Sequence, residues 1–254
     1  MKNNLLAIFL IAALSNAAAW GSGDENSSLA TGFEYSSGNY GLASNTNILI
    51  IPVEGMYRTG AWALKLTIPY IWITGHGGVL PKGIRSKAPP LMESTTYFGL
   101  GDIKAAATYN IFSQGESGTR VDLTGKVKFG TADTNLGTGE NDYAAQVDLY
   151  RQLDRFAPMI SLGYETLGSP TGVELNNVAY GILGGDYWYS DQTHAGFEFL
   201  LAQKTSAGVA GRRELTAYLN QGIDNDINIR GYVLKGFSDG SPDGGFGVMF
   251  VSYY

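Results

Sequence analysis

The chain has no cysteine and only two histidines among its 254 residues. The absence of cysteine excludes disulfides, thiolate chemistry and zinc sites built on cysteine. Charged residues are also scarce: they make up 16% of the chain, with 23 acidic against 17 basic side chains. Binding to a phosphate backbone needs a basic face, so this mildly acidic composition predicts no nucleic-acid partner.

Long apolar runs are missing everywhere except at the N-terminus. Lys2 precedes the apolar run Leu5–Leu14, and Ala17-Ala18-Ala19 then offers an A-x-A cleavage site. The run falls short of the ~20 residues that a membrane-spanning helix needs, which leaves an uncleaved anchor as the alternative. The sequence therefore predicts a signal peptide over residues 1–19, cleaved near Ala19, and one mature domain over residues 20–254.

Glycine and tyrosine are abundant instead, at 35 and 16 residues. From about residue 29 onward, apolar residues alternate with polar ones at a period of two, which is typical of β-strands and not of helices. On one face of residues 61–74 lie Trp62, Leu64, Leu66, Ile68, Tyr70 and Trp72. The same alternation predicts strands near residues 29–37, 46–57, 61–74, 97–112, 119–131, 142–153, 156–167, 177–189, 194–204, 212–223, 226–237 and 245–254.

These strands are long, and their connections alternate strictly between long and short. The expected strands have about 10–14 residues, whereas strands of soluble proteins usually have ~5–6 and a tilted transmembrane strand needs ~9–11. Long loops at one end and short turns at the other are typical of outer-membrane barrels. A soluble sandwich also fits the alternation, but it has no reason to keep this rhythm. We therefore predict an all-β, transmembrane, antiparallel up-and-down barrel of about 12 strands in the bacterial outer membrane, with both termini in the periplasm.

Aromatic residues near the ends of the strands support a membrane location. Interfacial girdles of tyrosine and tryptophan are expected there, although any single pair also fits an ordinary cross-strand contact. The predicted interfacial aromatics are Trp62, Tyr70, Trp72 and Tyr143. The chain ends in an alternating strand that includes Phe250 and closes on Tyr254, and it resembles the C-terminal signal read by the barrel-assembly machinery. An ordinary edge strand is the alternative there.

The polar face of the strands is the most informative set for function. A charge facing lipid at the midplane costs about 2–4 kcal/mol, so charged side chains of the strands should face the lumen. The predicted lumen-lining residues are Lys65, Asp102, Lys104, Asp122, Lys126, Lys128, Asp148, Glu198, Glu214 and Arg230. Both signs are present, so these residues either line a narrow aqueous path or pair into a plug. Twelve strands lie between the filled eight-stranded barrel and the open sixteen-stranded porin, which leaves both alternatives.

Two long loops offer further candidates. The segment 75–96, with Pro81, Pro89 and Pro90, either folds inward as a constriction or stays on the surface. The loop that begins at Asp133 and ends at Asp142 gathers oxygen donors suitable for calcium, but a hydrated acidic loop is the expectation we adopt.

The usual enzyme signatures are mostly missing. The sequence has no HExxH, Walker or CxxC motif. His76 and His194 are expected at opposite ends of the barrel, which argues against a shared metal site. An outer-membrane lipase would need a histidine beside a nucleophilic serine, and nothing around His76 indicates one. We therefore predict a non-enzyme with no catalytic residue, no metal and no cofactor.

Three segments carry a family resemblance: residues 99–109 (GLGDIKAAATY), residues 128–139 (KFGTADTNLGTG) and residues 142–148 (DYAAQVD). They resemble the outer-membrane transporter-like proteins of the phenol-degradation meta-pathway family. The resemblance is strongest over residues 60–170 and departs at Phe129-Gly130-Thr131, where a proline is expected before Thr-Gly. It implies an outer-membrane barrel that takes up small hydrophobic compounds, and it supplies no binding residues.

The sequence thus predicts a transporter or porin-like channel for small solutes, hydrophobic or aromatic ones among them. The expected partners are outer-membrane lipids, the barrel-assembly machinery and a small-molecule solute. A non-conducting barrel that serves as a structural or interaction platform in the envelope is the alternative function.

Overall fold

The computed structural model describes residues 26–76, 79–80, 84–85, 93–114, 118–133 and 135–254. The predicted signal peptide and most of segment 75–96 lie outside the described residues. Among the described residues, no helix is long and apolar enough to span a membrane. The strands are β1 (Asn26–Gly38), β2 (Thr46–Thr59), β3 (Trp62–Gly75), β4 (Val79–Leu80), β5 (Ile84–Arg85), β6 (Thr95–Leu100), β7 (Lys104–Gln114), β8 (Thr119–Lys128), β9 (Asp142–Arg151), β10 (Phe156–Thr166), β11 (Val178–Trp188), β12 (Thr193–Ala202), β13 (Arg212–Gly222), β14 (Ile227–Gly236) and β15 (Gly244–Tyr253).

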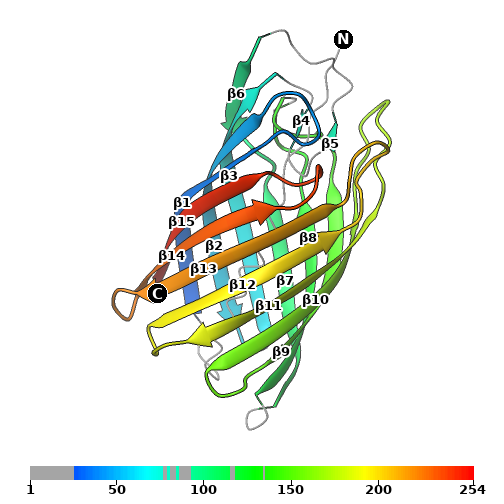
Figure 1. Ribbon diagram of the computed structural model, residues 1–254. Coiled ribbons are helices and arrows are strands. Elements are labelled where there is room, and N and C mark those ends of the chain that lie inside the picture. Colours follow the sequence, from blue (N-terminus) through cyan, green and yellow to red (C-terminus); the bar gives the residue numbers. More distant parts are fainter. Residues whose placement is uncertain (1–25, 77–78, 81–83, 86–92, 115–117, 134) are drawn as a thin grey trace.

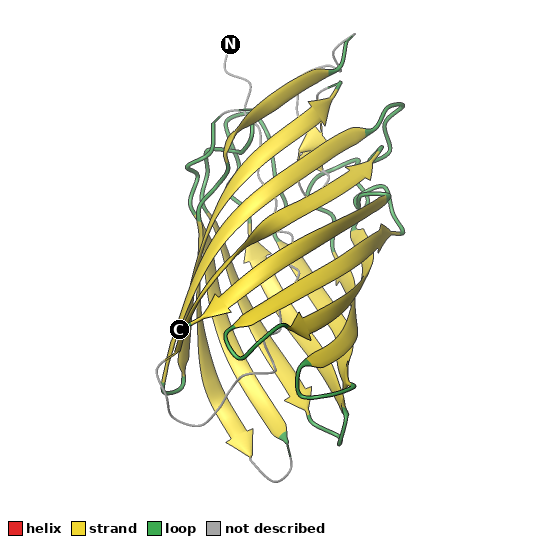
Figure 2. Ribbon diagram, turned by 90° about the vertical axis from the view of Figure 1, so that its left-hand side faces the viewer, coloured by secondary structure: helices red, strands yellow, loops and turns green. Residues whose placement is uncertain are grey.

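The strands close into one antiparallel barrel of tilted strands (Figures 1 and 2). Successive strands pair with each other, β15 pairs with β1, and β2 pairs with β3, while β4 and β5 form a small separate ribbon. Closure pairs the edges of the sheet, as a sheet surrounded by lipid requires. The prediction of a closed, antiparallel, twelve-stranded barrel is confirmed, because β6 and β7 together occupy one strand position beside β3.

The interruption between β6 and β7 is a feature that the alternation did not predict. Tyr70 of β3 faces Leu100, and Thr67 faces Lys104. Two residues of β3 therefore face the three residues 101–103, which is the geometry of a β-bulge. The backbone of Gly101 still donates to the carbonyl of Pro69 at 2.8 Å. The expected single strand 97–112 is thus wrong in this detail, and the bulge moves Asp102 out of the regular alternation.

The connections alternate as the sequence predicts. One end, called here the turn end, carries the short links 60–61, 115–118, 152–155, 189–192 and 223–226 and the C-terminus. The opposite end, called the loop end, carries the long links 39–45, 76–94, 129–141, 167–177, 203–211 and 237–243. Because β1 rises from the turn end and β15 returns to it, the first described residues and the C-terminus lie at the same end.

The outer face of the barrel is apolar. Exposed side chains on β3 include Trp62, Leu64, Leu66 and Ile68, and the alternate residues of that strand point inward. From Trp62 to Trp72 the strand rises about 34 Å at ~3.4 Å per residue. At a tilt of ~45° that length spans about 25 Å, which matches the apolar band of an outer-membrane barrel.

Candidate functional site

The inner face of the barrel is concave, so its side chains reach beyond the adjacent strand. Tyr180 on β11 donates to Gln146 on β9 at 2.9 Å, over the top of β10. Tyr218 on β13 reaches Asp186 on β11 in the same way, at 2.9 Å. Such contacts between strands that are not neighbours are possible only on the inner side of the wall, and they identify which face of each strand looks into the lumen.

The predicted lumen-lining residues fall into three groups in the structure. Those that keep partial exposure on the inner face are Lys65, Lys104 and Lys126. Those that are buried on the inner face are Asp122, Asp148, Glu198, Glu214 and Arg230. Those that are fully sealed from solvent are Asp102 and Lys128. The first two groups lie on the inner face of the barrel as predicted, but the sealed pair has no contact with solvent in the lumen.

The sealed pair forms a buried ion cluster with a third residue. Lys128 Nζ lies 3.1 Å from Asp102 and 3.1 Å from Asp142, and all three side chains are at most 1% exposed. The ammonium also donates to the Thr138 hydroxyl at 3.1 Å. Charges so far from water are stable only when each lies beside a charge of opposite sign, as the central ammonium does with both carboxylates. We call this set the Lys128 cluster.

The Lys128 cluster fixes the loop 129–141. Asp102 accepts a hydrogen bond from the backbone of Ala132 at 2.9 Å, and Thr138 binds Lys128 from the other side of the loop. Asp142 accepts from the backbone of Gly168 in the next long loop, at 3.0 Å. One buried lysine therefore ties the bulge, the loop 129–141 and the loop 167–177 together.

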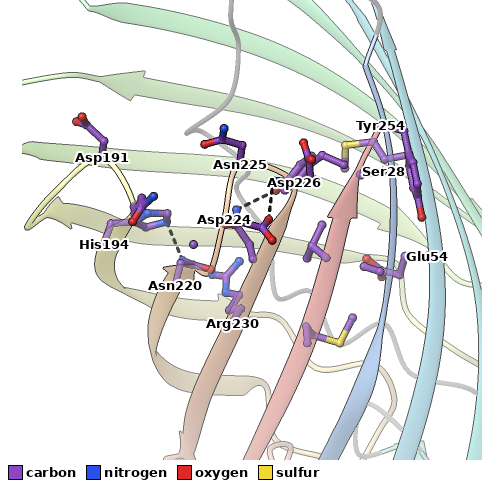
Figure 3. A pocket seen from close by; sticks show the side chains of 18 of the residues that line it. Ser28, Glu54, Asp191, His194, Asn220, Asp224, Asn225, Asp226, Arg230 and Tyr254 are labelled. Atoms are coloured by element: carbon purple, nitrogen blue, oxygen red, sulfur yellow. Dashed lines mark hydrogen bonds between the residues drawn. The ribbon is translucent and has the colours of Figure 1, made fainter.

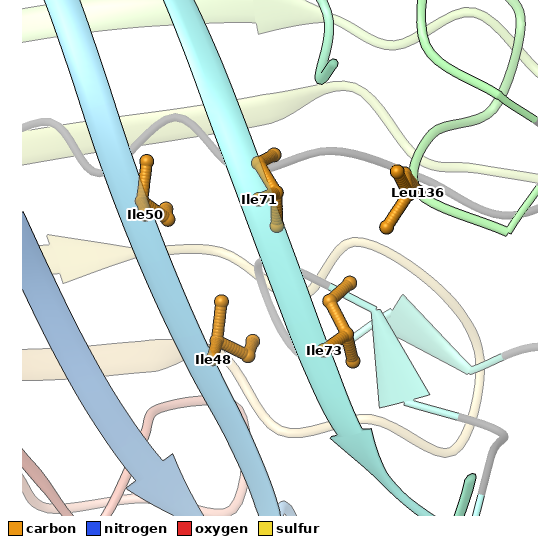
Figure 4. Close-up of a cluster of buried hydrophobic side chains, with 5 residues drawn as sticks. All are labelled: Ile48, Ile50, Ile71, Ile73 and Leu136. Atoms are coloured by element: carbon orange, nitrogen blue, oxygen red, sulfur yellow. The ribbon is translucent and has the colours of Figure 1, made fainter. Parts of the chain in front are cut away.

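The tip of this loop packs inside the barrel. Leu136 is 1% exposed and belongs to one buried cluster with four isoleucines on the inner face of β2 and β3 (Figure 4). The members of this apolar cluster are Ile48, Ile50, Ile71, Ile73 and Leu136, with Tyr97 and Ala132 packed against them. Among the described residues, the loop that folds inward is therefore 129–141. Most of segment 75–96, for which an inward constriction was the other candidate, lies outside the described residues.

The polar-face analysis missed this apolar cluster. A detectable signal exists, because residues 48–53 (ILIIPV) and 68–73 (IPYIWI) are apolar at every position, so alternation is lost there. Continuous apolar runs are typical of strands that are buried on both faces. The half of β2 and β3 near the loop end has lipid on one side and the loop on the other.

The loop also changes the interpretation of its oxygen donors. Asp142 is engaged with Lys128, and Asp133 accepts backbone hydrogen bonds from Leu136 and Gly137 through its carbonyl. Among the described residues, no group of three or more metal-binding side chains is gathered at one place. His194 lies at the turn end, where its Nε2 is 2.7 Å from the amide nitrogen of Asn220.

Inward charges are distributed unevenly around the wall. The inward cations on β3, β7 and β8 are Lys65, Lys104, Arg120, Lys126 and Lys128, which share these strands with Asp122. The inward acids on β9 to β13 are Asp142, Asp148, Glu165, Asp186, Glu198 and Glu214, which share those strands with Arg212. One wall is therefore predominantly cationic and the other predominantly anionic.

Tyrosine rings lie flat along the inner wall above glycines. Tyr180 is paired with Gly163, Tyr218 with Gly196, and Tyr232 with Gly247. A Cβ atom at each of these glycines would overlap the neighbouring ring, so the ring can occupy this position only beside a glycine. Because the rings lie along the wall and do not project across the lumen, they leave space inside the barrel.

One such space lies at the turn end. A cavity of about 650 Å³ opens between the short turns and the first residues of β1 (Figure 3). Its lining includes Glu54, Lys65, Trp188, His194, Asn220 and Arg230. Glu54 pairs with Lys65 at 3.0 Å across β2 and β3. The cavity combines charged, amide and aromatic groups in one wall.

The aromatic residues expected at the membrane boundary lie on the outer face near both ends. Trp62 contacts Tyr109 near the turn end with ring centroids 4.8 Å apart, and Tyr70 contacts Trp72 nearer the loop end at 4.6 Å. Tyr143 is exposed at the loop end of β9. Phe250 is exposed on the outer face of β15, and Tyr254 follows that strand with its backbone hydrogen-bonded to Ser27.

No protein-family model and no curated protein sequence matches the chain. Solved structures match over nearly its whole length. The COG4313 outer membrane channel from Pseudomonas putida F1 superposes with a TM-score of 0.71 at 12% identity, covering 94% of this chain and 98% of that one. The KdgM porin, alone or in complex with disordered oligogalacturonate, superposes with a TM-score of 0.53 at 9% identity, covering 89% of this chain and 98% of that one. The chain has the fold of outer-membrane channels.

Proposed function

We propose that this chain is a channel of the bacterial outer membrane that passes small solutes with an apolar part. The inner face of the barrel carries this proposal. Near the turn end it encloses an open polar cavity of about 650 Å³, and towards the loop end it presents apolar side chains of β2 and β3. A purely aqueous pore gains nothing from inward isoleucines, whereas a solute with an apolar part can cover them in place of Leu136 when the loop tip moves aside.

The membrane location rests on the outer face. Its apolar side chains form a band of the right height, with Trp62, Tyr70, Trp72 and Tyr143 near the edges where interfacial aromatics belong. The short turns are assigned to the periplasm and the long loops to the cell exterior. Phe250 and Tyr254 are assigned as the signal that the assembly machinery recognises, and outer-membrane lipid surrounds the barrel.

The solute class is suggested by the family resemblance. Residues 99–109 and 128–139 resemble the phenol-degradation meta-pathway family, which implies uptake of small hydrophobic compounds. In this structure the two segments form the bulge and the inward loop that meet at the Lys128 cluster. The resembling residues therefore build the constriction, which is the part of a channel that selects its solute.

One observation favours the alternative function. The Lys128 cluster and Leu136 hold the loop 129–141 in place with residues 136–138 buried inside the barrel, as a permanent plug would require. In that case the barrel is a non-conducting platform for partners in the envelope. The two functions differ in whether the loop leaves a continuous path beside it.

Single-channel recording separates them. The purified protein is inserted into planar bilayers, and folding is checked by its heat-dependent migration on a gel. We expect small discrete openings in the wild type and larger ones in Leu136→Asp, because a buried carboxylate displaces the loop tip from the isoleucines. Leu219→Asn on the outer face is the control for a general disturbance. A folded wild type without openings would overturn the channel and favour the platform.

A further inference from the structure

Five neighbouring strands contribute one inward side chain each to a row across the cavity at the turn end. The strand registers place Trp188 beside His194, His194 beside Asn220, Asn220 beside Arg230, and Arg230 beside Met249. All five residues line the cavity. Figure 3 shows His194, Asn220 and Arg230 side by side on the same wall. Such a row exposes aromatic, amide, cationic and apolar side chains to the cavity at a fixed spacing, because adjacent strands lie about 5 Å apart.

Arg230 differs from Arg120 and Arg212, two other inward arginines, in its surroundings. Arg120 pairs with Asp122, and Arg212 pairs with Glu214, in each case two residues along the same strand. The corresponding neighbours of Arg230 are Asn228 and Tyr232, which carry no charge. Within the part of the chain that the structure describes, no carboxylate lies within ion-pair distance of the Arg230 guanidinium.

The Arg230 guanidinium is nevertheless held in place. Its central carbon lies 3.9 Å from the centre of the Tyr218 ring, and the residue is only 8% exposed. A guanidinium stacked on a ring keeps its N–H donors at its edge, where they can bind a carboxylate with two parallel hydrogen bonds. The nearby Asp186 accepts the Tyr218 hydroxyl at 2.9 Å and lies beyond ion-pair distance of the guanidinium. A buried, oriented cation that has no ion pair with any described carboxylate, beside a cavity, is a preformed site for an anionic group.

The acidic residues of the same cavity already have partners or lie in water. Glu54 pairs with Lys65, and the Asp224 carboxylate accepts from the backbones of Asp226 and Ile227 at 2.9 and 2.7 Å. Asp191 and Asp226 are exposed at the rim, where water and salt screen them. The open charge on the inner wall of the cavity is therefore positive.

Beside this charge the row becomes aromatic. The Trp188 and His194 rings contact each other with centroids 4.1 Å apart. His194 is two strands from Arg230, about 10 Å along the wall, which is close to the length of a one-ring carboxylic acid. Asn220 lies between them, and its amide has two N–H donors, of which the contact with His194 uses at most one.

We propose that this row binds a small aromatic monocarboxylate. The carboxylate lies on Arg230 and the Asn220 amide, and the ring lies against His194 and Trp188. This site rests on the proposed channel function and names the class of solute that the channel takes up. It is a binding subsite at the periplasmic exit of the lumen, separate from the constriction at the loop end.

Titration calorimetry of the detergent-solubilised, folded barrel tests the site with benzoate as the probe. We expect saturable benzoate binding to the wild type and binding of benzamide that is about tenfold to a hundredfold weaker, because the amide lacks the charge. Arg230→Gln should weaken benzoate by a similar factor, and Arg230→Lys by less. Arg120→Gln is the matched control, since Arg120 also lies over a tyrosine but has Asp122 as its partner; it should change benzoate binding by about twofold at most.

The aromatic half of the site is tested with Trp188→Leu and with acetate. This variant should weaken benzoate severalfold and leave the weaker binding of acetate unchanged. Equal benzoate affinity in the wild type and in folded Arg230→Gln, or equal affinity for benzoate and benzamide, would overturn the site. Channel openings without benzoate binding would refute the site and keep the channel, whereas binding without openings would keep the site and refute the channel.

Discussion

The two halves of the lumen are built in opposite ways. The half near the loop end is filled: Leu136 packs in a cluster with four isoleucines, and Lys128 is sealed between two aspartates. The half near the turn end is open: its wall encloses about 650 Å³ and holds the Arg230 guanidinium, which has no ion pair with a described carboxylate. In the proposed channel, the same twelve strands provide a narrow constriction followed by a wider vestibule. Selection by size and polarity would then belong to the first half and recognition of charge to the second.

We expect the largest loss in the free energy of unfolding when the Lys128 cluster is disrupted. Lys128→Met leaves Asp102 and Asp142 buried without a counter-charge, and losing one partner of a buried pair typically costs about 3–5 kcal/mol. We expect a loss of this size in the free energy of unfolding, measured by urea titration in detergent. Lys126→Met is the control, because Lys126 keeps partial exposure and donates to Gln146 at the surface of the lumen. Equal losses in both variants would contradict the special role of Lys128.

The next effect concerns the loop tip. Leu136→Ala removes most of a fully buried side chain, which typically costs about 2–5 kcal/mol in a rigid core. We expect the low end of this range in the free energy of unfolding, because the loop can relax, together with larger single-channel openings. Leu219→Ala, at an exposed outward position, should leave the openings unchanged. Openings of wild-type size in Leu136→Ala would show that the loop does not set the constriction.

A smaller effect is expected where tyrosine lies over glycine. Gly163→Ala places a methyl group against the Tyr180 ring and should lower the free energy of unfolding by about 1–3 kcal/mol through overpacking. Gly125 has nothing near its missing Cβ, so Gly125→Ala serves as the control and should be close to neutral. If both variants unfold at the same urea concentration, the flat placement of the rings does not depend on glycine.

The smallest effect is on ion preference. Lys126→Glu reverses one partly exposed charge on the cationic wall. The interaction energy of two unit charges 4 Å apart in water is about 1 kcal/mol. We expect the permeability ratio to shift toward cations by at most about fivefold, read from the reversal potential in a salt gradient. Glu174→Lys, in an exposed loop, provides the control. A shift toward anions in Lys126→Glu would contradict an inward position for this side chain.

The sequence predicts the shell of this protein well because the shell follows a local rule. Alternation with period two places each strand to within a few residues, and the rhythm of long and short links fixes the closed, up-and-down order. The burial of Asp102 and Lys128 depends on contacts between residues far apart along the chain. Lys128 meets Asp102 only because a bulge re-aims that aspartate, and no local pattern marks the bulge.

The inward loop was unpredictable for a similar reason. Segment 75–96 is longer and richer in proline, yet the described loop that folds inward is 129–141, because it has a leucine that fits the isoleucines of β2 and β3. The loss of alternation in residues 48–53 and 68–73 marks an apolar inner face, but it does not say which loop covers it. The vestibule row likewise depends on the register of five strands, which sequence spacing alone does not determine.

The difference between the two halves can be measured directly because the chain has no cysteine of its own. Single cysteines at position 71, under the loop tip, and at position 228, in the wall of the vestibule, are exposed to a small charged thiol reagent in the folded barrel. The structure predicts rapid labelling of Asn228→Cys and strong protection of Ile71→Cys, with the protection lost when Leu136→Asp is added. Equal labelling of the two positions in the otherwise wild-type barrel would contradict a lumen that is closed near the loop end and open near the turn end.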